Sequence, residues 1–295
     1  MYFGCDFFDS PDFYSEVFFA SKALMESGQP ITPGVFYKFG GPNKFFNSVQ
    51  PVETETPTGH APGVGYLINT DNPPGGCRVF CKNIVVWSIA NPLTTPTLSG
   101  STLSTFDKYI QPPSIVEPGY NVGAPDNSIG STPIFTASRG RGLIAFSLMT
   151  GGGTDPSAPG VLWGEVHPTI DMSGTLTNVS EYQAGYIREG GGIGTFYPAI
   201  MASNDGSLWI VANQSSPSLY PRIVIGVQRA SDPLGQFGNV RALKIGVGPP
   251  DGGSGELGLY NAASVDGFAA GQSHVWLAGQ YITSSLWATY LGRDL

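Results

Sequence analysis

The sequence predicts an all-β protein built from repeated antiparallel units. Gly accounts for 41 and Pro for 25 of the 295 residues, yet 41% of the residues are hydrophobic, so Gly and Pro mark turns between short strands rather than disorder. Only 12% of the residues are charged, which leaves little material for solvated helix faces. The clearest unit, residues 195–229, reads as three apolar strands separated by a tight Asn204-Asp205-Gly206 turn and a polar loop.

The same plan recurs in five units of one domain, residues 1–295. We place the units at about 1–40, 60–107, 130–185, 195–245 and 258–295. Their central strands are apolar almost throughout, as in Leu208-Trp209-Ile210-Val211, which indicates that both faces of each strand are covered. We therefore predict a β-propeller of about five four-stranded blades, because radial stacking covers both sheet faces and leaves only short edges. A β-sandwich with long loops is the alternative.

The start of the chain does not determine how many blades the predicted propeller has. Two strands are expected on either side of the Ser10-Pro11-Asp12 turn, and Lys22–Glu26 resembles one helical turn. A chain that opens directly on an apolar strand, without a lead-in, is typical of a shortened sequence. The five units are therefore either a complete small ring or part of a larger one.

The charge balance excludes two classes of partner. The net charge is −8 and the isoelectric point is about 4.8, which argues against nucleic acids and anionic membranes because both require clustered Lys and Arg. No apolar run approaches the ~20 residues that span a bilayer, so we expect no membrane insertion. We expect a monomer.

The cysteines favour an oxidising compartment. Cys77 and Cys81 enclose three residues, and we predict a small-loop disulfide between them, which leaves Cys5 over. A zinc half-site is the alternative, but the sequence offers no second Cys/His pair to complete it. We expect no metal site and no cofactor, because no dinucleotide or phosphate-loop motif is present.

One segment resembles a known family. Residues 194–235, in particular Tyr220-Pro221, Arg229 and Ser231-Asp232-Pro233-Leu234-Gly235, resemble a segment of large secreted bacterial and fungal β-propeller proteins that are mostly described as hypothetical or sialidase-like. The resemblance implies an extracellular propeller and no particular reaction. Glu256-Leu257-Gly258-Leu259-Tyr260 departs from the family pattern, because the family has an Asp before this Tyr.

Four carboxylates are the candidate catalytic residues. A glycosidase needs one protonated acid and one ionised base or nucleophile, ~5 Å apart in retaining and ~6.5–9.5 Å apart in inverting enzymes. Inner strands of a propeller converge on a central pocket, where we expect Asp6, Asp9, Glu55 and Glu165. Asp6 and Asp9 flank an apolar Phe pair, where burial would raise a carboxyl pKa. The alternative for each is a turn-capping or solvated carboxylate.

Three aromatic residues are the candidate substrate contacts: Tyr197, Tyr260 and Trp163. A tyrosine ring offers a sugar an apolar face and a hydroxyl, although packing between blades is the alternative role. The resulting hypothesis is an extracellular propeller that binds or cleaves a glycan, with catalysis itself left open. A non-catalytic module for adhesion or protein interaction is the alternative.

Overall fold

The computed structural model is all-β apart from one short helix, α1 (Lys22–Glu26), which confirms the all-β class that we predicted in the part of the chain that it describes. The structure describes residues 2–9, 12–36, 39, 48–53, 64–71, 77–92, 94–104, 108–118, 120–121, 134–140, 142–151, 157–203, 205–238, 240–248, 261–266, 274–284 and 286–293. Within these residues, no helix is long and apolar enough to cross a membrane, and no group of three or more His, Cys, Asp or Glu residues forms a metal site.

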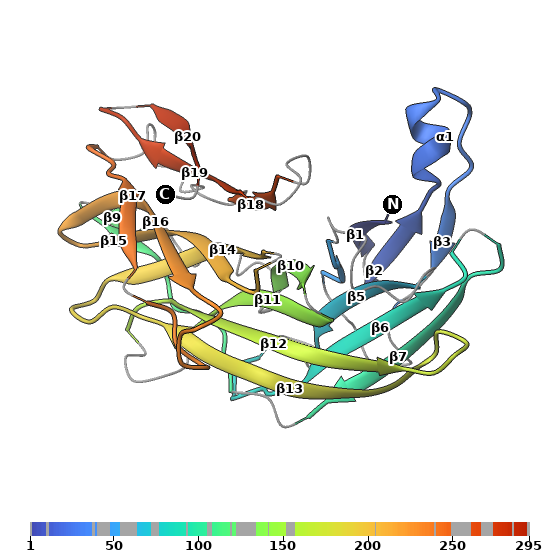
Figure 1. The fold of residues 1–295 in the computed structure, drawn as a ribbon. Coiled ribbons are helices and arrows are strands. Elements are labelled where there is room, and N and C mark those ends of the chain that lie inside the picture. The colour runs from blue at the N-terminus through green and yellow to red at the C-terminus, as the bar shows by residue number, and fades with distance from the viewer. Residues whose placement is uncertain are drawn as a thin grey trace.

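In the described part of the chain, the strands form five antiparallel sheets of three or four strands and one two-stranded ladder. The five sheets follow one another in chain order, and in each sheet consecutive strands are neighbours (Figure 1). Sheet 1 contains β1 (Tyr2–Asp9), β2 (Asp12–Phe19) and β3 (Gly34–Phe36). Sheet 2 contains β4 (Gln50–Pro51), β5 (Val64–Thr70), β6 (Ile84–Ala90) and β7 (Thr97–Leu103). Sheet 3 contains β10 (Ile134–Gly140), β11 (Leu143–Thr150), β12 (Gly160–Ile170) and β13 (Leu176–Ile187).

Sheet 4 has the same four-stranded order and sheet 5 has three described strands. Sheet 4 contains β14 (Gly194–Ala202), β15 (Leu208–Ser216), β16 (Leu219–Gln228) and β17 (Arg241–Lys244). Sheet 5 contains β18 (Ala262–Val265), β19 (Val275–Ile282) and β20 (Trp287–Arg293). A small ladder, β8 (Val116–Glu117) with β9 (Tyr120–Asn121), lies between sheets 2 and 3 in sequence. Each of the five predicted units thus contains most of one sheet.

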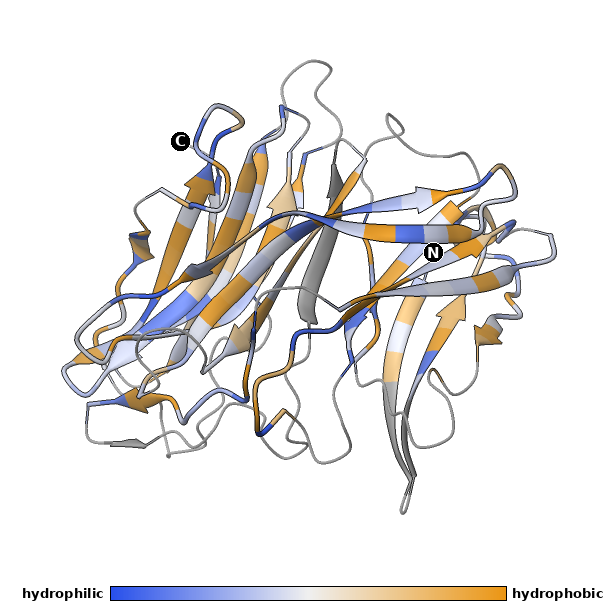
Figure 2. Ribbon diagram, turned by 90° about the horizontal axis from the view of Figure 1, so that it is seen from below, coloured by the Kyte–Doolittle hydropathy of each residue, from blue (hydrophilic) through white to orange (hydrophobic). Residues whose placement is uncertain are grey.

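Adjacent sheets pack face to face, and the side-chain alternation of the central strands explains their continuous apolar sequences. In β6, Val85 and Ile89 pack in the layer against sheet 1, whereas Ile84 and Val86 pack in the layer against sheet 3. Successive side chains of a strand point to opposite faces, so a strand between two neighbours needs apolar residues at every position. Figure 2 shows these hydrophobic runs along the strands, with hydrophilic residues in the turns.

The same division holds in sheet 4. Leu208 and Ile210 of β15 pack against sheet 3, and Val211 packs against sheet 5. The first strands of neighbouring sheets are also in contact, from β1 through β4, β10 and β14 to β18. The five sheets therefore form a continuous row whose inner margin is made by these first strands.

The predicted disulfide between Cys77 and Cys81 is confirmed. The loop that it closes is held to a distant part of the chain, because the Cys81 and Tyr109 backbones exchange two hydrogen bonds of 2.8 and 2.9 Å. Cys5 is a free, exposed thiol on β1.

We predict that Phe146→Ala destabilises the protein by about 3 to 5 kcal/mol, because Phe146 is fully buried between sheets 2 and 3 and its loss leaves a cavity. Urea denaturation followed by tryptophan fluorescence measures the change. Phe80→Ala removes the same atoms from an exposed site and is the matched control. Equal losses for the two variants would show that this layer does not stabilise the fold.

Candidate functional site

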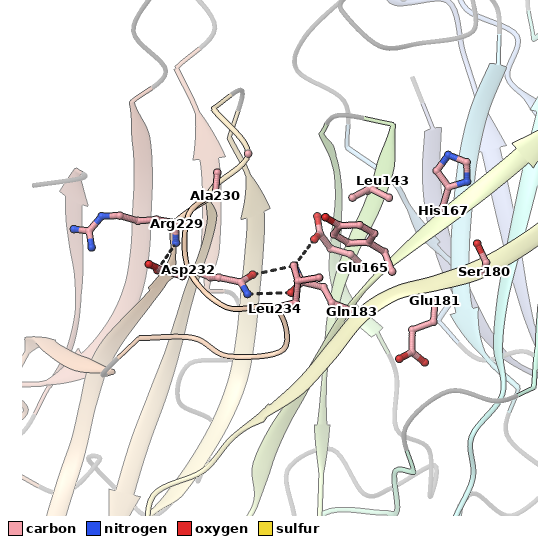
Figure 3. A pocket seen from close by; sticks show the side chains of 13 residues that line it. Leu143, Glu165, His167, Ser180, Glu181, Gln183, Arg229, Ala230, Asp232 and Leu234 are labelled. Atoms are coloured by element: carbon pink, nitrogen blue, oxygen red, sulfur yellow. Dashed lines mark hydrogen bonds between the residues drawn. The ribbon is translucent and has the colours of Figure 1, made fainter.

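A polar cleft of about 450 Å³ lies between sheets 3 and 4 (Figure 3). Its walls come from the start of β11, from β12 and β13, from the β14–β15 turn, and from the end of β16 with the loop that follows. It is not the central pocket that we expected, because most of its lining comes from the outer strands of two neighbouring sheets rather than from the first strands.

The alternation of side chains along β12 explains why Glu165 faces this cleft. Val161 and Trp163 pack in the apolar layer between sheets 3 and 4, and Glu165 and His167 follow at the same two-residue spacing on β12. Glu165 is buried at the margin of that layer, and His167 is exposed. The cleft is therefore the polar continuation of a hydrophobic layer, at the point where the two sheets stop packing on each other.

A pair of glutamine side chains joins the two sheets beside Glu165. Gln183 on β13 and Gln228 on β16 each donate from Nε2 to the Oε1 of the other at 2.9 Å. The Gln183 Nε2 also donates to the Glu165 Oε2 at 2.5 Å. All three side chains are buried, and this network fixes the orientation of the carboxylate (Figure 3).

The segment that carries the family resemblance forms one wall. The Asp232 carboxylate accepts from the Arg229 backbone N–H at 2.7 Å, which closes the turn after β16. Gly235, at φ +78°, donates its N–H to the Gln183 Oε1 at 2.8 Å. A Cβ at Gly185 would lie 2.4 Å from the Gly235 carbonyl oxygen, so glycine is required where this loop crosses β13.

The rim of the cleft carries further polar and aromatic groups. Tyr182 is 50% exposed, and Glu181 beside it is exposed too. In Figure 3 the Glu181 carboxylate extends away from Glu165, and the Arg229 guanidinium lies on the far side of the cleft from Glu165. The lining offers the Ser180 hydroxyl, the Arg229 guanidinium and carboxylates for hydrogen bonding, and one tyrosine ring at the rim for stacking.

Three of the seven sequence-predicted site residues have described side chains, and of these three Glu165 lines the cleft. Asp6 and Asp9 lie on β1, where the structure does not describe their side chains, and Glu55 and Tyr260 lie outside the described residues.

The two remaining aromatic candidates are buried and offer no ring face to a ligand. Trp163 packs edge-on to Phe237 with ring centroids 4.6 Å apart, and Tyr197 packs edge-on to Phe196 at 5.6 Å. For both, the observed role is packing. Tyr197 also has φ +49° in an irregularity of β14, and its carbonyl oxygen accepts from the Asn261 Nδ2 at 2.7 Å. This contact ties sheet 4 to the segment that leads into sheet 5.

Asp205 has the structural role that its turn predicts. Its carboxylate accepts from the Ser203 hydroxyl and from the Ser207 backbone N–H, the latter at 2.9 Å. Partial burial alone would raise the pKa of Asp205, but these hydrogen bonds outweigh it and lower the pKa. Asp171 closes the β12–β13 turn in the same way, with its pKa lowered mainly by the hydrogen bond from the Ser173 side chain.

Sequence reasoning missed one unusual acid, Glu117. It is 2% exposed, its Oε2 has no hydrogen-bond partner among the described residues, and burial raises its pKa to about 7. It lies on β8, in the Pro-rich segment before sheet 3, next to Val116, whose carbonyl oxygen accepts from the Ser215 hydroxyl at 2.7 Å. Glu117 does not line the cleft. No local pattern distinguishes it, because its burial depends on contact with β15.

Similarity to known proteins assigns no family. No protein-family model matches the chain, and no curated protein matches it. Its class therefore rests on the fold and the site: five stacked antiparallel sheets in the described part of the chain, with a polar cleft between the third and the fourth.

We predict that Glu117 makes the protein less stable as pH rises from about 4.5 to about 7. Burial keeps this carboxyl protonated in the folded state up to about pH 7, whereas the unfolded chain releases the proton near pH 4.5. The contribution of Glu117 to the free energy of unfolding is therefore highest below pH 4.5 and is lost as pH rises through 7. We expect a loss of about 1 to 2 kcal/mol, less than the full shift implies because nearby solvent screens the charge.

Urea denaturation at a series of pH values measures this effect, and Glu117→Gln should remove it because the amide does not titrate. Glu53→Gln replaces an exposed acid and is the control. A wild-type pH profile that coincides with that of Glu117→Gln would contradict the assignment.

Proposed function

We propose that this chain is an extracellular β-propeller that binds a glycan in the cleft between sheets 3 and 4. The observation that carries the proposal is the row of hydrogen-bonding side chains, Glu165, Gln183 and Gln228, that leads to the exposed ring of Tyr182. The propeller architecture is supported by the sequential meander sheets, by their face-to-face packing and by the contacts between their first strands.

The cleft has the chemistry that recognition of neutral sugars requires. Each sugar hydroxyl both donates and accepts hydrogen bonds, and the Ser180 hydroxyl, the Arg229 guanidinium and the Glu181 carboxylate of the lining supply both functions. Tyr182 adds an apolar ring face for the C–H surface of a sugar. The volume of about 450 Å³ lies within the ~300–1,000 Å³ common for small-ligand sites.

An extracellular location is supported by the disulfide between Cys77 and Cys81, because small-loop disulfides persist in oxidising compartments. The net charge of −8 favours a neutral or cationic glycan over an anionic one, since like charges repel.

Binding is favoured over cleavage by the arrangement of the acids. Hydrolysis needs two carboxyl groups that face one scissile bond. Glu165 is held by Gln183, Glu181 extends away from it, and Glu117, whose pKa is raised, does not line the cleft. Hydrolysis therefore remains the second candidate, with Glu165 as its acid or base.

We predict that Tyr182→Ala weakens glycan binding about 10-fold, which corresponds to the loss of one aromatic contact of about 1.4 kcal/mol. Calorimetric titration with the best ligand from a panel of neutral oligosaccharides measures the change. Phe80→Ala removes another exposed ring and should leave the affinity unchanged. Unchanged binding by Tyr182→Ala, or the absence of any ligand in the panel, would count against the cleft as a glycan site.

Release of reducing ends from the same oligosaccharides tests the hydrolytic alternative. If the wild-type protein releases them, Glu165→Gln should lower the rate at least about 100-fold and keep most of the binding, because the amide retains an acceptor for Gln183. Binding without release identifies a non-catalytic module.

A further inference from the structure

We propose that the loop closed by the disulfide between Cys77 and Cys81 is a membrane-contact loop, whose apolar tip inserts into an anionic lipid surface. The tip consists of Val79, which is 77% exposed, and Phe80, which is 58% exposed. Two consecutive large apolar side chains therefore face solvent. Grouped apolar side chains bordered by polar residues mark interaction sites, whereas single exposed ones are ordinary.

The base of the loop is anchored, so the exposure of the tip does not come from a loose backbone. The Cys81 and Tyr109 backbones exchange two hydrogen bonds, and the Gln111 N–H donates to the Cys77 carbonyl oxygen at 2.9 Å. Tyr109 is itself fully buried, and its hydroxyl donates to the Asn83 carbonyl oxygen at 2.7 Å. A constrained loop loses little conformational freedom on binding, which favours contact through its tip.

Three exposed cations border the tip. Arg78 lies inside the loop and Lys82 directly follows it. The fold adds a third cation from a distant part of the chain, because the Lys108 ammonium lies 5.8 Å from the centre of the Phe80 ring. Apolar side chains with basic residues beside them are the combination that binds the interface of an anionic membrane.

The charge around the loop is opposite to that of the whole chain. Residues 77–83 and 108–112 contain the three cations and no acid, whereas the chain has a net charge of −8. Asp71, which precedes the loop, accepts a hydrogen bond from the Asn83 side chain at 3.4 Å, and Asp107 lies outside the described residues. An anionic surface is repelled by the molecule as a whole and attracted at this loop, so it would hold the chain in one orientation.

A lipid surface fits the loop better than a folded protein partner does. Stable protein interfaces cover about 800 Å² and ~20–30 residues on each side, whereas the tip and its cations are five residues. A lipid interface requires fewer contacts, because inserted apolar side chains and neighbouring basic residues act together. The aliphatic stem of Lys108 can follow the Phe80 ring inward while its ammonium stays at the level of the headgroups.

This contact needs no segment that spans the membrane. The expectation that anionic membranes are excluded rests on scattered Lys and Arg residues, and only the fold brings Lys108 to Phe80. The proposal is independent of the proposed glycan site, because neither the loop residues nor Lys108 line the cleft.

Flotation with lipid vesicles over a range of lipid concentrations tests the proposal. We expect the wild-type chain to bind mixed vesicles of phosphatidylcholine and phosphatidylglycerol at least about 10-fold more tightly than vesicles of phosphatidylcholine alone, because the cations attract anionic headgroups. Phe80→Ser should weaken binding to the mixed vesicles at least about 10-fold, since it removes an inserted ring. Met172→Ser is the matched control and should bind like the wild type. Met172 is an exposed apolar residue of the β12–β13 turn, which lies beside Ala90 at the other end of β6.

Three outcomes would contradict the proposal. Wild-type protein that binds neither kind of vesicle overturns it and leaves the loop for an acidic protein partner. Equal binding to the two vesicle compositions overturns the role of the cations, and wild-type affinity of Phe80→Ser overturns the role of the tip.

A fluorescence measurement reports the position of the tip independently of the affinity. The emission of Val79→Trp should shift to shorter wavelength when mixed vesicles are added and should be quenched by brominated lipid, because the new ring enters an apolar environment. Met172→Trp places the same ring at the exposed control site, and both variants retain the native tryptophans. Equal quenching of the two variants would show that the tip does not insert.

Discussion

The structure depends on covering both faces of each middle sheet. The central strands of sheets 2, 3 and 4 are apolar at consecutive positions, and such a strand is stable only between two neighbouring sheets. This requirement forces the sheets into a row. It also explains why charged residues are few, since most strand positions face another sheet rather than solvent.

The polar cleft arises where that packing ends. Along β12 the same face carries Trp163 in the apolar layer, then Glu165 at its margin, then His167 in solvent. At the margin, the apolar contact is replaced by the Gln183–Gln228 pair, which satisfies its own buried amides and holds Glu165 in one orientation. A preorganised polar margin between rigid sheets is a good location for a ligand because little ordering is needed on binding.

The local environment of each acidic residue determines its role. Asp171 and Asp205 close turns through local hydrogen bonds that lower their pKa values, whereas burial raises the pKa of Glu117. Glu165 differs from all three because its carboxylate is held by a side chain of the neighbouring strand and faces a cleft. Acidic residue type alone therefore says little about function here.

The sequence by itself determined the long apolar strands, the Asp205 turn, the short helix and the disulfide, because each depends on local alternation, turn chemistry or a three-residue loop. Only the tertiary structure decided which side chains meet. Trp163 and Tyr197 were reasonable sugar contacts from residue type, but their faces of the strands point into layers between sheets. Gln183 and Gln228 join Glu165 across two sheets, and Glu117 is buried by a distant strand, so no sequence spacing could have grouped them.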